Sequence, residues 1–154
     1  MAAPDSPRIF VPPPLIVAVT LLVGLWFDGR LQSWPNTPPL LLIIGSGLTT
    51  AGFSLIGIAL GLFRRARTRP EPWQPATELV QTGIYRFTRN PMYLGMLVTY
   101  AGVALMLQSP AAGLLLIPLG VVIDRFVIAR EEAYLRDCFG RSYDAYRSKV
   151  RRWL

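Results

Sequence analysis

Two long blocks without a single charge constrain this chain more than any other feature of its sequence. The block 40–63 runs for 24 residues and the block 90–123 for 34 residues. A helix needs about 20 apolar residues to cross the ~30 Å hydrocarbon core of a bilayer. The whole chain is only 16% charged, whereas soluble domains have about 25% charged residues. The pattern therefore predicts an integral membrane protein.

The apolar blocks also predict how many times the chain crosses the membrane. A further block ends at Phe27 without a small-residue cleavage site, which favours a span over a secretory signal peptide. The 34-residue block is broken only by Gln108-Ser109-Pro110, a sequence with turn chemistry. We therefore expect an all-α fold, a polytopic membrane helical bundle with about four transmembrane helices. As a single domain over 1–154, it has expected spans at 14–27, 40–63, 91–107 and 111–129, a cytoplasmic loop at 64–90 and a cytoplasmic amphipathic tail at 130–154.

The distribution of basic residues predicts the orientation of these spans. The segment 64–89 carries six Arg and two Glu, the tail 129–154 carries seven basic and four acidic residues, and the loop 28–39 is neutral. Positive loops stay in the cytoplasm. With four spans, the N-terminus, the arginine-rich loop and the tail all fall on that side. We expect a bacterial inner-membrane protein with both termini cytoplasmic, whose +7 charge faces membrane lipids and not nucleic acid.

Several types of chemistry are excluded by composition. The chain has no His and one Cys, so it holds no Ser-His-Asp triad, no Cys-His pair, no internal disulfide and no Cys-rich metal site. We expect no metal. Gly45-Ser46-Gly47 lacks the strand and the third glycine of a dinucleotide loop, while Gly57-x-x-x-Gly61 predicts a close contact between helices.

Two polar clusters stand at the ends of the predicted hairpin 91–129. If its helices are antiparallel, Arg89 to Gly95 and Asp124 to Glu132 meet at one cytoplasmic surface. The first turn of a helix offers free N–H groups that suit a carboxylate. Glu131 or Glu132 suits an ammonium or a ribose hydroxyl, and the rings of Tyr85 and Tyr93 suit a flat ring or a sulfonium.

Other interpretations of the same residues stay open on spacing alone. Arg89 is also explained as a positive-inside residue, and Asp124-Arg125 as a self-neutralising pair in the membrane. Tyr93 also fits an interfacial aromatic belt. Composition and spacing therefore lead to a site of unknown ligand.

Two sequence blocks resemble a known family. Gly83-Ile84-Tyr85 followed by Arg89-Asn90-Pro91-Met92-Tyr93-Leu94-Gly95 is similar to the G-x-Y…R-H-P-x-Y-x-G motif of isoprenylcysteine carboxyl methyltransferases and phospholipid N-methyltransferases. Glu131-Glu132, Leu135, Phe139-Gly140, Tyr143 and Tyr146 resemble the family's second element. The resemblance covers about half of the chain, from residue 79 to residue 150.

The resemblance implies methyl transfer from S-adenosylmethionine to a lipophilic acceptor, an isoprenylcysteine-like carboxylate or a lipid headgroup, that arrives from within the bilayer. Asn90 stands where the family usually has His, so this position hydrogen-bonds but does not titrate. Glu132 matches the family's functional glutamate. On this basis the expected catalytic residues are Glu132, Tyr93 and Arg89, and the expected cofactor-binding residues are Tyr85, Arg89, Asn90, Pro91, Tyr93, Gly95, Glu131 and Glu132.

Two other classes of function remain open at this point. The R-x-P-x-Y region is shared with membrane sterol reductases, and the arginine-rich loop suits the 2′-phosphate of NADPH. A non-catalytic lipid-binding membrane protein is the third candidate. Binding of S-adenosylhomocysteine or of NADPH distinguishes the three. The sequence does not give the oligomeric state or the identity of the acceptor.

Overall fold

The computed structural model describes residues 11–33, 35–68 and 77–154, and every element in these ranges is helical. The all-α expectation is therefore confirmed. The sequence also predicts that Pro70, Pro72 and Pro75 keep the arginine-rich loop from forming one continuous helix, and these three residues lie outside the described ones. The elements are α1 (Pro13–Phe27), α2 (Pro39–Arg65), the short 3-10 helix η1 (Gly83–Arg86), α3 (Pro91–Met106), α4 (Pro110–Val122), the π-helix η2 (Ile123–Ile128), α5 (Ala129–Phe139) and α6 (Arg141–Lys149).

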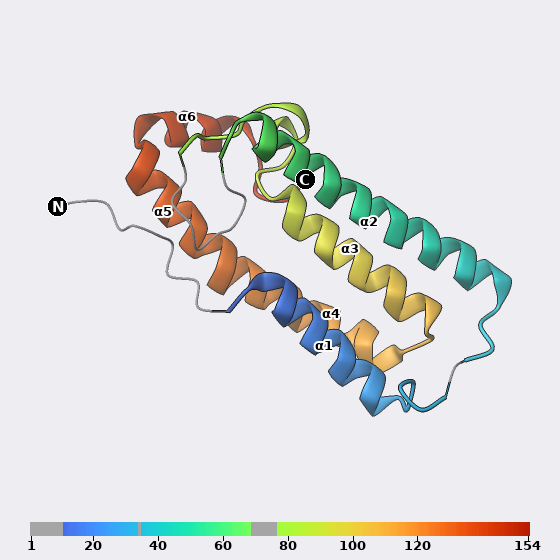
Figure 1. Cartoon of the computed structure of the whole chain (residues 1–154). Coiled ribbons are helices and arrows are strands. Elements are labelled where there is room, and N and C mark those ends of the chain that lie inside the picture. The colour runs from blue at the N-terminus through green and yellow to red at the C-terminus, as the bar shows by residue number, and fades with distance from the viewer. Residues whose placement is uncertain (1–10, 34, 69–76) are drawn as a thin grey trace.

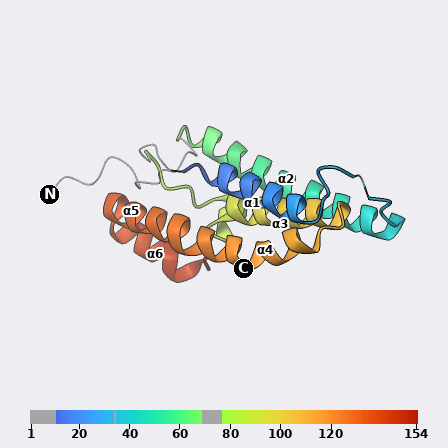
Figure 2. The same ribbon diagram turned by 90° about the horizontal axis from the view of Figure 1, so that it is seen from below.

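The four apolar helices lie side by side with their long axes roughly aligned (Figure 1). α2 packs against α3, and α1 packs against α4. α5 continues the line of α4 past the end of α1, and α6 folds back beside α5 (Figure 2). The C-terminus consequently lies close to the start of α3 (Figure 1).

A proline begins each of the four apolar helices. Pro13, Pro39, Pro91 and Pro110 are the first residues of α1, α2, α3 and α4. Proline suits this position because its missing N–H would have no partner in the first turn. The helix starts expected from the sequence at 14, 40, 91 and 111 fall within one residue of these positions.

The contact between α2 and α3 depends on two pairs of glycines. A Cβ atom added at Gly52 would lie 2.6 Å from the carbonyl oxygen of Gly95, and one added at Gly102 would lie 2.6 Å from that of Gly45. Glycine lets two helix backbones approach this closely. The predicted contact through Gly57-x-x-x-Gly61 is wrong within the described chain, because a Cβ at either position would meet no atom within 4 Å.

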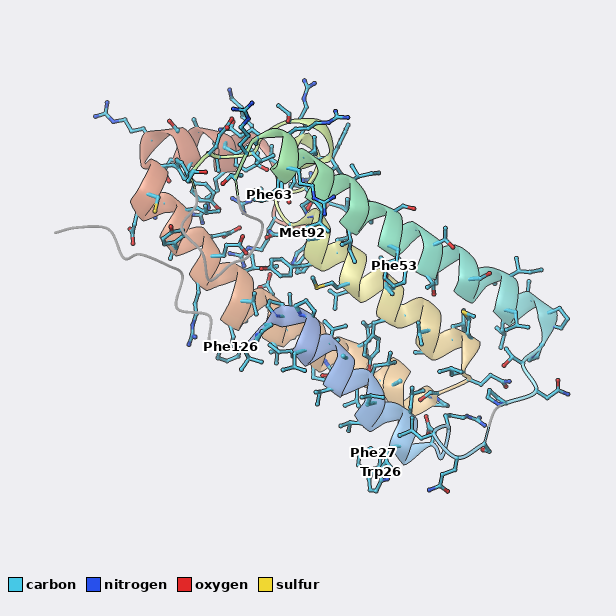
Figure 3. All side chains as sticks on the ribbon, viewed as in Figure 1. Trp26, Phe27, Phe53, Phe63, Met92 and Phe126 are labelled. Carbon is cyan, nitrogen blue, oxygen red and sulfur yellow. The ribbon has the colours of Figure 1, made fainter. Side chains whose placement is uncertain are left out.

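Among the residues that the structure describes, two helices are long and apolar enough to cross a membrane. They are Pro39–Arg65, of 27 residues, and the continuous helix Pro110–Phe139, of 30 residues. α1 has 15 residues and α3 has 16, so each reaches only about 22–24 Å at 1.5 Å per residue. The expected count of four transmembrane helices is not established by these lengths. Phe126 points away from the bundle (Figure 3) and is 58% exposed, and Phe53 on α2 is 61% exposed.

The fourth apolar helix does not stop at the expected end of the span at residue 129. It passes through the π-helical segment Ile123–Ile128 and continues as α5 to Phe139. Single π-turns inside α-helices occur often at functional sites. The chain then reverses at Gly140, where φ of +50° and ψ of −123° favour glycine.

Candidate functional site

Three segments distant in sequence meet beside the first turn of α3. They are the loop that leads into α3, the η2–α5 part of the long helix, and the chain that follows α6. The sequence predicts that the first two meet, and the structure joins them through side-chain contacts. The third segment, residues 151–153, was not expected there.

An ion pair joins the two expected clusters. The Arg89 Nη2 atom lies 3.0 Å from Glu132 Oε1, and the two side chains are only 9% and 10% exposed. Arg89 precedes α3, whereas Glu132 lies in the first turn of α5. Because a buried charge is stable only when it is paired, each residue fixes the other. The pair therefore confirms that the hairpin brings Arg89 and Glu132 together.

Arg152 is a second cation on the same carboxylate. Its Nη2 donates to Glu132 Oε2 at 2.6 Å, and its Nε donates to Glu132 Oε1 at 3.3 Å. Its Nη1 also lies 3.1 Å from Asp124 Oδ2, and the Trp153 indole N–H donates to Asp124 Oδ1 at 3.0 Å. One guanidinium thus bridges two acidic residues that are eight positions apart on the long helix.

The expected ion pair of Asp124 with Arg125 exists, but it is weaker than the ion pair of Asp124 with Arg152. Arg125 Nε lies 3.4 Å from Asp124 Oδ2, and the Arg125 side chain is 75% exposed. Exposed pairs contribute at most about 1 kcal/mol. Asp124 therefore belongs to the cluster with Arg152, and the interpretation as a pair of adjacent residues is incomplete.

The main chain of residues 151–152 is hydrogen-bonded to the residues that precede α3. The Arg89 N–H donates to the Arg151 carbonyl oxygen at 3.0 Å. The Thr88 hydroxyl and the Asn90 side-chain amide donate to the Arg152 carbonyl oxygen at 3.1 and 3.0 Å. Asn90 therefore serves here as a donor to the backbone, a role that does not require the titratable ring of a histidine.

A second connection links α3 to α5 through Tyr93. The Tyr93 hydroxyl donates to Glu131 Oε2 at 2.7 Å. Tyr85 is buried nearby, and burial raises the pKa of its phenol, with the charge of Glu131 as a further cause. The Tyr146 hydroxyl donates to the Tyr85 carbonyl oxygen at 2.7 Å, so α6 also holds this part of the site.

Two donor atoms of Arg89 are the strongest indication that the cluster binds a ligand. The Nε and Nη1 atoms of Arg89 are buried and have no hydrogen-bond partner within the described residues. A buried donor without a partner costs about 1–3 kcal/mol, and more when it is charged. A carboxylate or phosphate group accepts such donors well. The guanidinium of Arg89 is thus prepared for an anionic group of a ligand.

The remaining predicted residues have mainly structural contacts. Pro91 is the buried first residue of α3. Gly95 lies against α2, where an added Cβ would be 2.7 Å from the Gly52 carbonyl oxygen and 2.8 Å from Ile56 Cγ1. These contacts explain why a small residue stands at position 95. They do not test its expected contact with the cofactor.

Four contributors to the cluster are not predictable from the sequence pattern. Arg152 and Trp153 looked like the basic and apolar faces of an amphipathic tail, and nothing in their spacing distinguishes them from their neighbours. Tyr143 and Tyr146 belong to the second block of the resemblance but were not assigned to the site. Tyr143 is 1% exposed, and burial, followed by the charge of Glu132, raises its pKa to about 12, so it stays protonated near neutral pH.

The fold and the site together define an all-helical protein in which apolar helices carry a buried ionic cluster at one end. The chain belongs to the phospholipid methyltransferase family, whose pattern matches residues 37–142. This match includes Arg89, Tyr93, Glu131 and Glu132. It ends before Arg152.

Curated relatives agree with this family. An uncharacterized protein of Haemophilus influenzae is 46% identical over 63 residues, which are 41% of this chain and all of that protein. Protein-S-isoprenylcysteine O-methyltransferase B of Arabidopsis thaliana is 38% identical over 76 residues, which are 47% of this chain and 37% of that protein. The Schizosaccharomyces pombe protein-S-isoprenylcysteine O-methyltransferase is 39% identical over 75 residues, 47% of this chain and 30% of that protein. The match thus spans less than half of these named methyltransferases. No solved structure shows a significant match to the chain.

Proposed function

We propose that this protein transfers a methyl group from S-adenosylmethionine to a lipophilic acceptor at the cytoplasmic face of a membrane. The observation that carries the proposal is the buried guanidinium of Arg89, which has two unused donors between the two polar blocks. Membership of a methyltransferase family implies a methyl donor. The bacterial inner membrane, four spans and cytoplasmic termini are part of this proposal.

The residues of the cluster fit the polar groups of this cofactor. The Nε and Nη1 atoms of Arg89 would donate hydrogen bonds to its carboxylate. Glu131 uses Oε2 for the Tyr93 hydroxyl, and its other oxygen would accept the ammonium or a ribose hydroxyl. Tyr85 and Tyr93 would lie beside the sulfonium or the adenine, and Asn90, Pro91 and Gly95 would contact the cofactor from the start of α3.

Glu132 keeps its place in the proposed site, but its geometry favours orientation of Arg89 over direct contact with the acceptor. Arg89 and Arg152 together occupy both of its carboxylate oxygens. With both oxygens engaged in charge-assisted hydrogen bonds, this carboxylate holds the two guanidinium groups in place. Proton removal, where an acceptor needs it, would therefore depend on Glu131 or Tyr93.

When bound, the cofactor supplies an electrophilic methyl group that is transferred by in-line displacement. This reaction needs alignment of the reactants at about 3–3.5 Å and exclusion of water more than acid–base help. An isoprenylcysteine-like carboxylate is already a nucleophile at pH 7. A lipid amine must first lose a proton. A chain without His favours the carboxylate acceptor.

The test is calorimetric titration of S-adenosylhomocysteine into purified protein in detergent, with Arg89→Met compared with Arg86→Met. Arg86 lies three residues earlier and its side chain is exposed, so it is a matched control for charge. We expect the Arg89 variant to bind at least ten-fold more weakly and the Arg86 variant to bind like wild type. Binding of NADPH in place of S-adenosylhomocysteine would support a reductase. Cofactor binding without methyl transfer to an isoprenylcysteine analogue or a phospholipid would support a non-catalytic role.

A further inference from the structure

We infer that Arg152 is a positioning residue of the cofactor site, and that the backbone of its segment and the Trp153 side chain hold it in place. The inference rests on the proposed function. It extends the site beyond the region matched by the family, residues 37–142, to a segment whose sequence shows only basic and apolar residues.

The Arg152 side chain holds the acidic half of the site in one arrangement. Its three nitrogens make contacts of 2.6 to 3.3 Å with both oxygens of Glu132 and both oxygens of Asp124. A planar guanidinium supplies such paired contacts, and the point charge of a lysine does not. Glu132 in turn fixes Arg89 Nη2. The chain of contacts therefore runs from Asp124 to the guanidinium that carries the unused donors.

The backbone of the same segment is fixed independently of this side chain. The carbonyl oxygens of residues 151 and 152 accept three hydrogen bonds from Thr88, Arg89 and Asn90. Trp153 packs against the main apolar core and donates to Asp124. Because these contacts are many and partly buried, the segment is built into the site and is not a loose tail that covers it.

Loss of Arg152 would leave two carboxylates with only Arg89 as a buried cation. Removing one partner of a buried charge pair is costly because it leaves an uncompensated charge. Arg89 would then turn toward the uncompensated acids, and its Nε and Nη1 donors would no longer be held for a ligand. The expected consequence is weaker cofactor binding, separate from any loss of stability.

The structure provides a matched control at the neighbouring residue. Arg151 carries the same charge in the same segment, but its side chain is exposed and only its carbonyl oxygen takes part in the contacts. We expect Arg152→Met to weaken S-adenosylhomocysteine binding at least ten-fold and Arg151→Met to change it less than two-fold. Arg152→Lys should recover only part of the loss.

A double variant separates positioning from a general effect on folding. In Asp124→Asn/Arg152→Met, the acid that lost its partner is neutralised, so the melting temperature should recover toward wild type. S-adenosylhomocysteine affinity should stay at least ten-fold weaker, because Glu132 still lacks its paired contact. Wild-type affinity in Arg152→Met, or recovery of affinity together with stability in the double variant, would overturn the inference. If wild type and Arg151→Met also fail to bind, the proposed function itself is wrong and the inference falls with it.

Discussion

At the scale of single residues, Tyr93 connects two helices through one hydroxyl group. Its hydrogen bond to Glu131 is made to a group that can carry charge, and such bonds contribute about 1.5–3 kcal/mol. We expect Tyr93→Phe to lower the free energy of unfolding by roughly 1.5–3 kcal/mol. We also expect weaker S-adenosylhomocysteine binding, because Glu131 loses the donor that fixes its carboxylate.

Tyr100→Phe is the matched control for this change. The Tyr100 hydroxyl donates to the Ala112 carbonyl oxygen at 2.9 Å within the core, away from the ionic cluster. Both variants should be destabilised in thermal unfolding, but only the Tyr93 variant should lose cofactor affinity in calorimetry. Equal affinity in the two variants would remove Tyr93 from the site.

The charge of Asp28 joins the end of α1 to the start of α4, at the end of the bundle opposite the ionic cluster. Its Oδ2 accepts from the Ser109 hydroxyl and, at 2.9 Å, from the Ala111 N–H at the start of α4. The Ser109 hydroxyl is the main cause that holds the pKa of Asp28 below its ordinary value of 3.8. A carboxyl group whose pKa is lower in the folded state stabilises the fold at pH values above its pKa in the unfolded state. This stabilisation is lost as the pH falls through its pKa in the folded state.

We therefore expect the melting temperature of wild type to fall more steeply than that of Asp28→Asn as the pH is lowered from 6 to below 3.8. The variant should be the less stable protein at pH 6, because the asparagine oxygen is a weaker acceptor for the two donors. Thermal unfolding in a series of buffers measures both effects. Parallel curves for the two proteins would show that this charge is not linked to folding.

At the scale of elements, glycines on α2 have two different environments. Gly52 faces the α3 backbone, whereas Gly57 is open. We expect Gly52→Ala to reduce stability by about 1–3 kcal/mol, because an added methyl forces the two helices apart. We expect Gly57→Ala to be neutral, or stabilising by up to about 1 kcal/mol, because alanine has the higher helix propensity. Thermal unfolding in detergent compares the two, and equal destabilisation would mean that the α2–α3 contact differs from the one described.

Elements were the most predictable part of this protein. Uncharged blocks and N-terminal prolines place the four apolar helices because both signals are local. The glycine contacts were assigned to the wrong pair, because the sequence shows which residues are small but not which face of α2 meets α3. The π-helix at Ile123–Ile128 has no sequence signal of its own, since it results from how the helix packs.

The site was predictable to the extent that it follows from the hairpin. The contacts of Arg89 with Glu132 and of Tyr93 with Glu131 need only two antiparallel helices with a short turn. Arg152 was missed for a physical reason. A chain reversal at Gly140 and the helix that follows it bring Arg152 back to Asp124 and Glu132. Charge alone does not tell which of several arginines in this tail will contact the two acidic residues.

At the scale of the whole molecule, the orientation in the membrane is open to direct measurement. Cys138 is the only cysteine and is exposed on α5, on the side expected to be cytoplasmic. A membrane-impermeant maleimide should label it in inverted inner-membrane vesicles but not in intact cells. In Cys138→Ser/Ser33→Cys, whose new cysteine lies in the exposed loop between α1 and α2, the pattern should be reversed. Labelling of both positions from the same side would contradict a bundle of four spans.

The backbone bonds between residues 151–152 and the loop before α3 have a consequence for how this protein matures. Apolar helices leave the ribosome and partition into lipid one after another, but the ionic cluster lacks a member until residue 153 has been synthesised. Until then Asp124 and Glu132 lack the contacts of Arg152, and Glu132 has only Arg89 as its partner. A chain that ends before residue 152 should therefore keep its apolar helices but lack the contacts that orient Glu132 and Asp124.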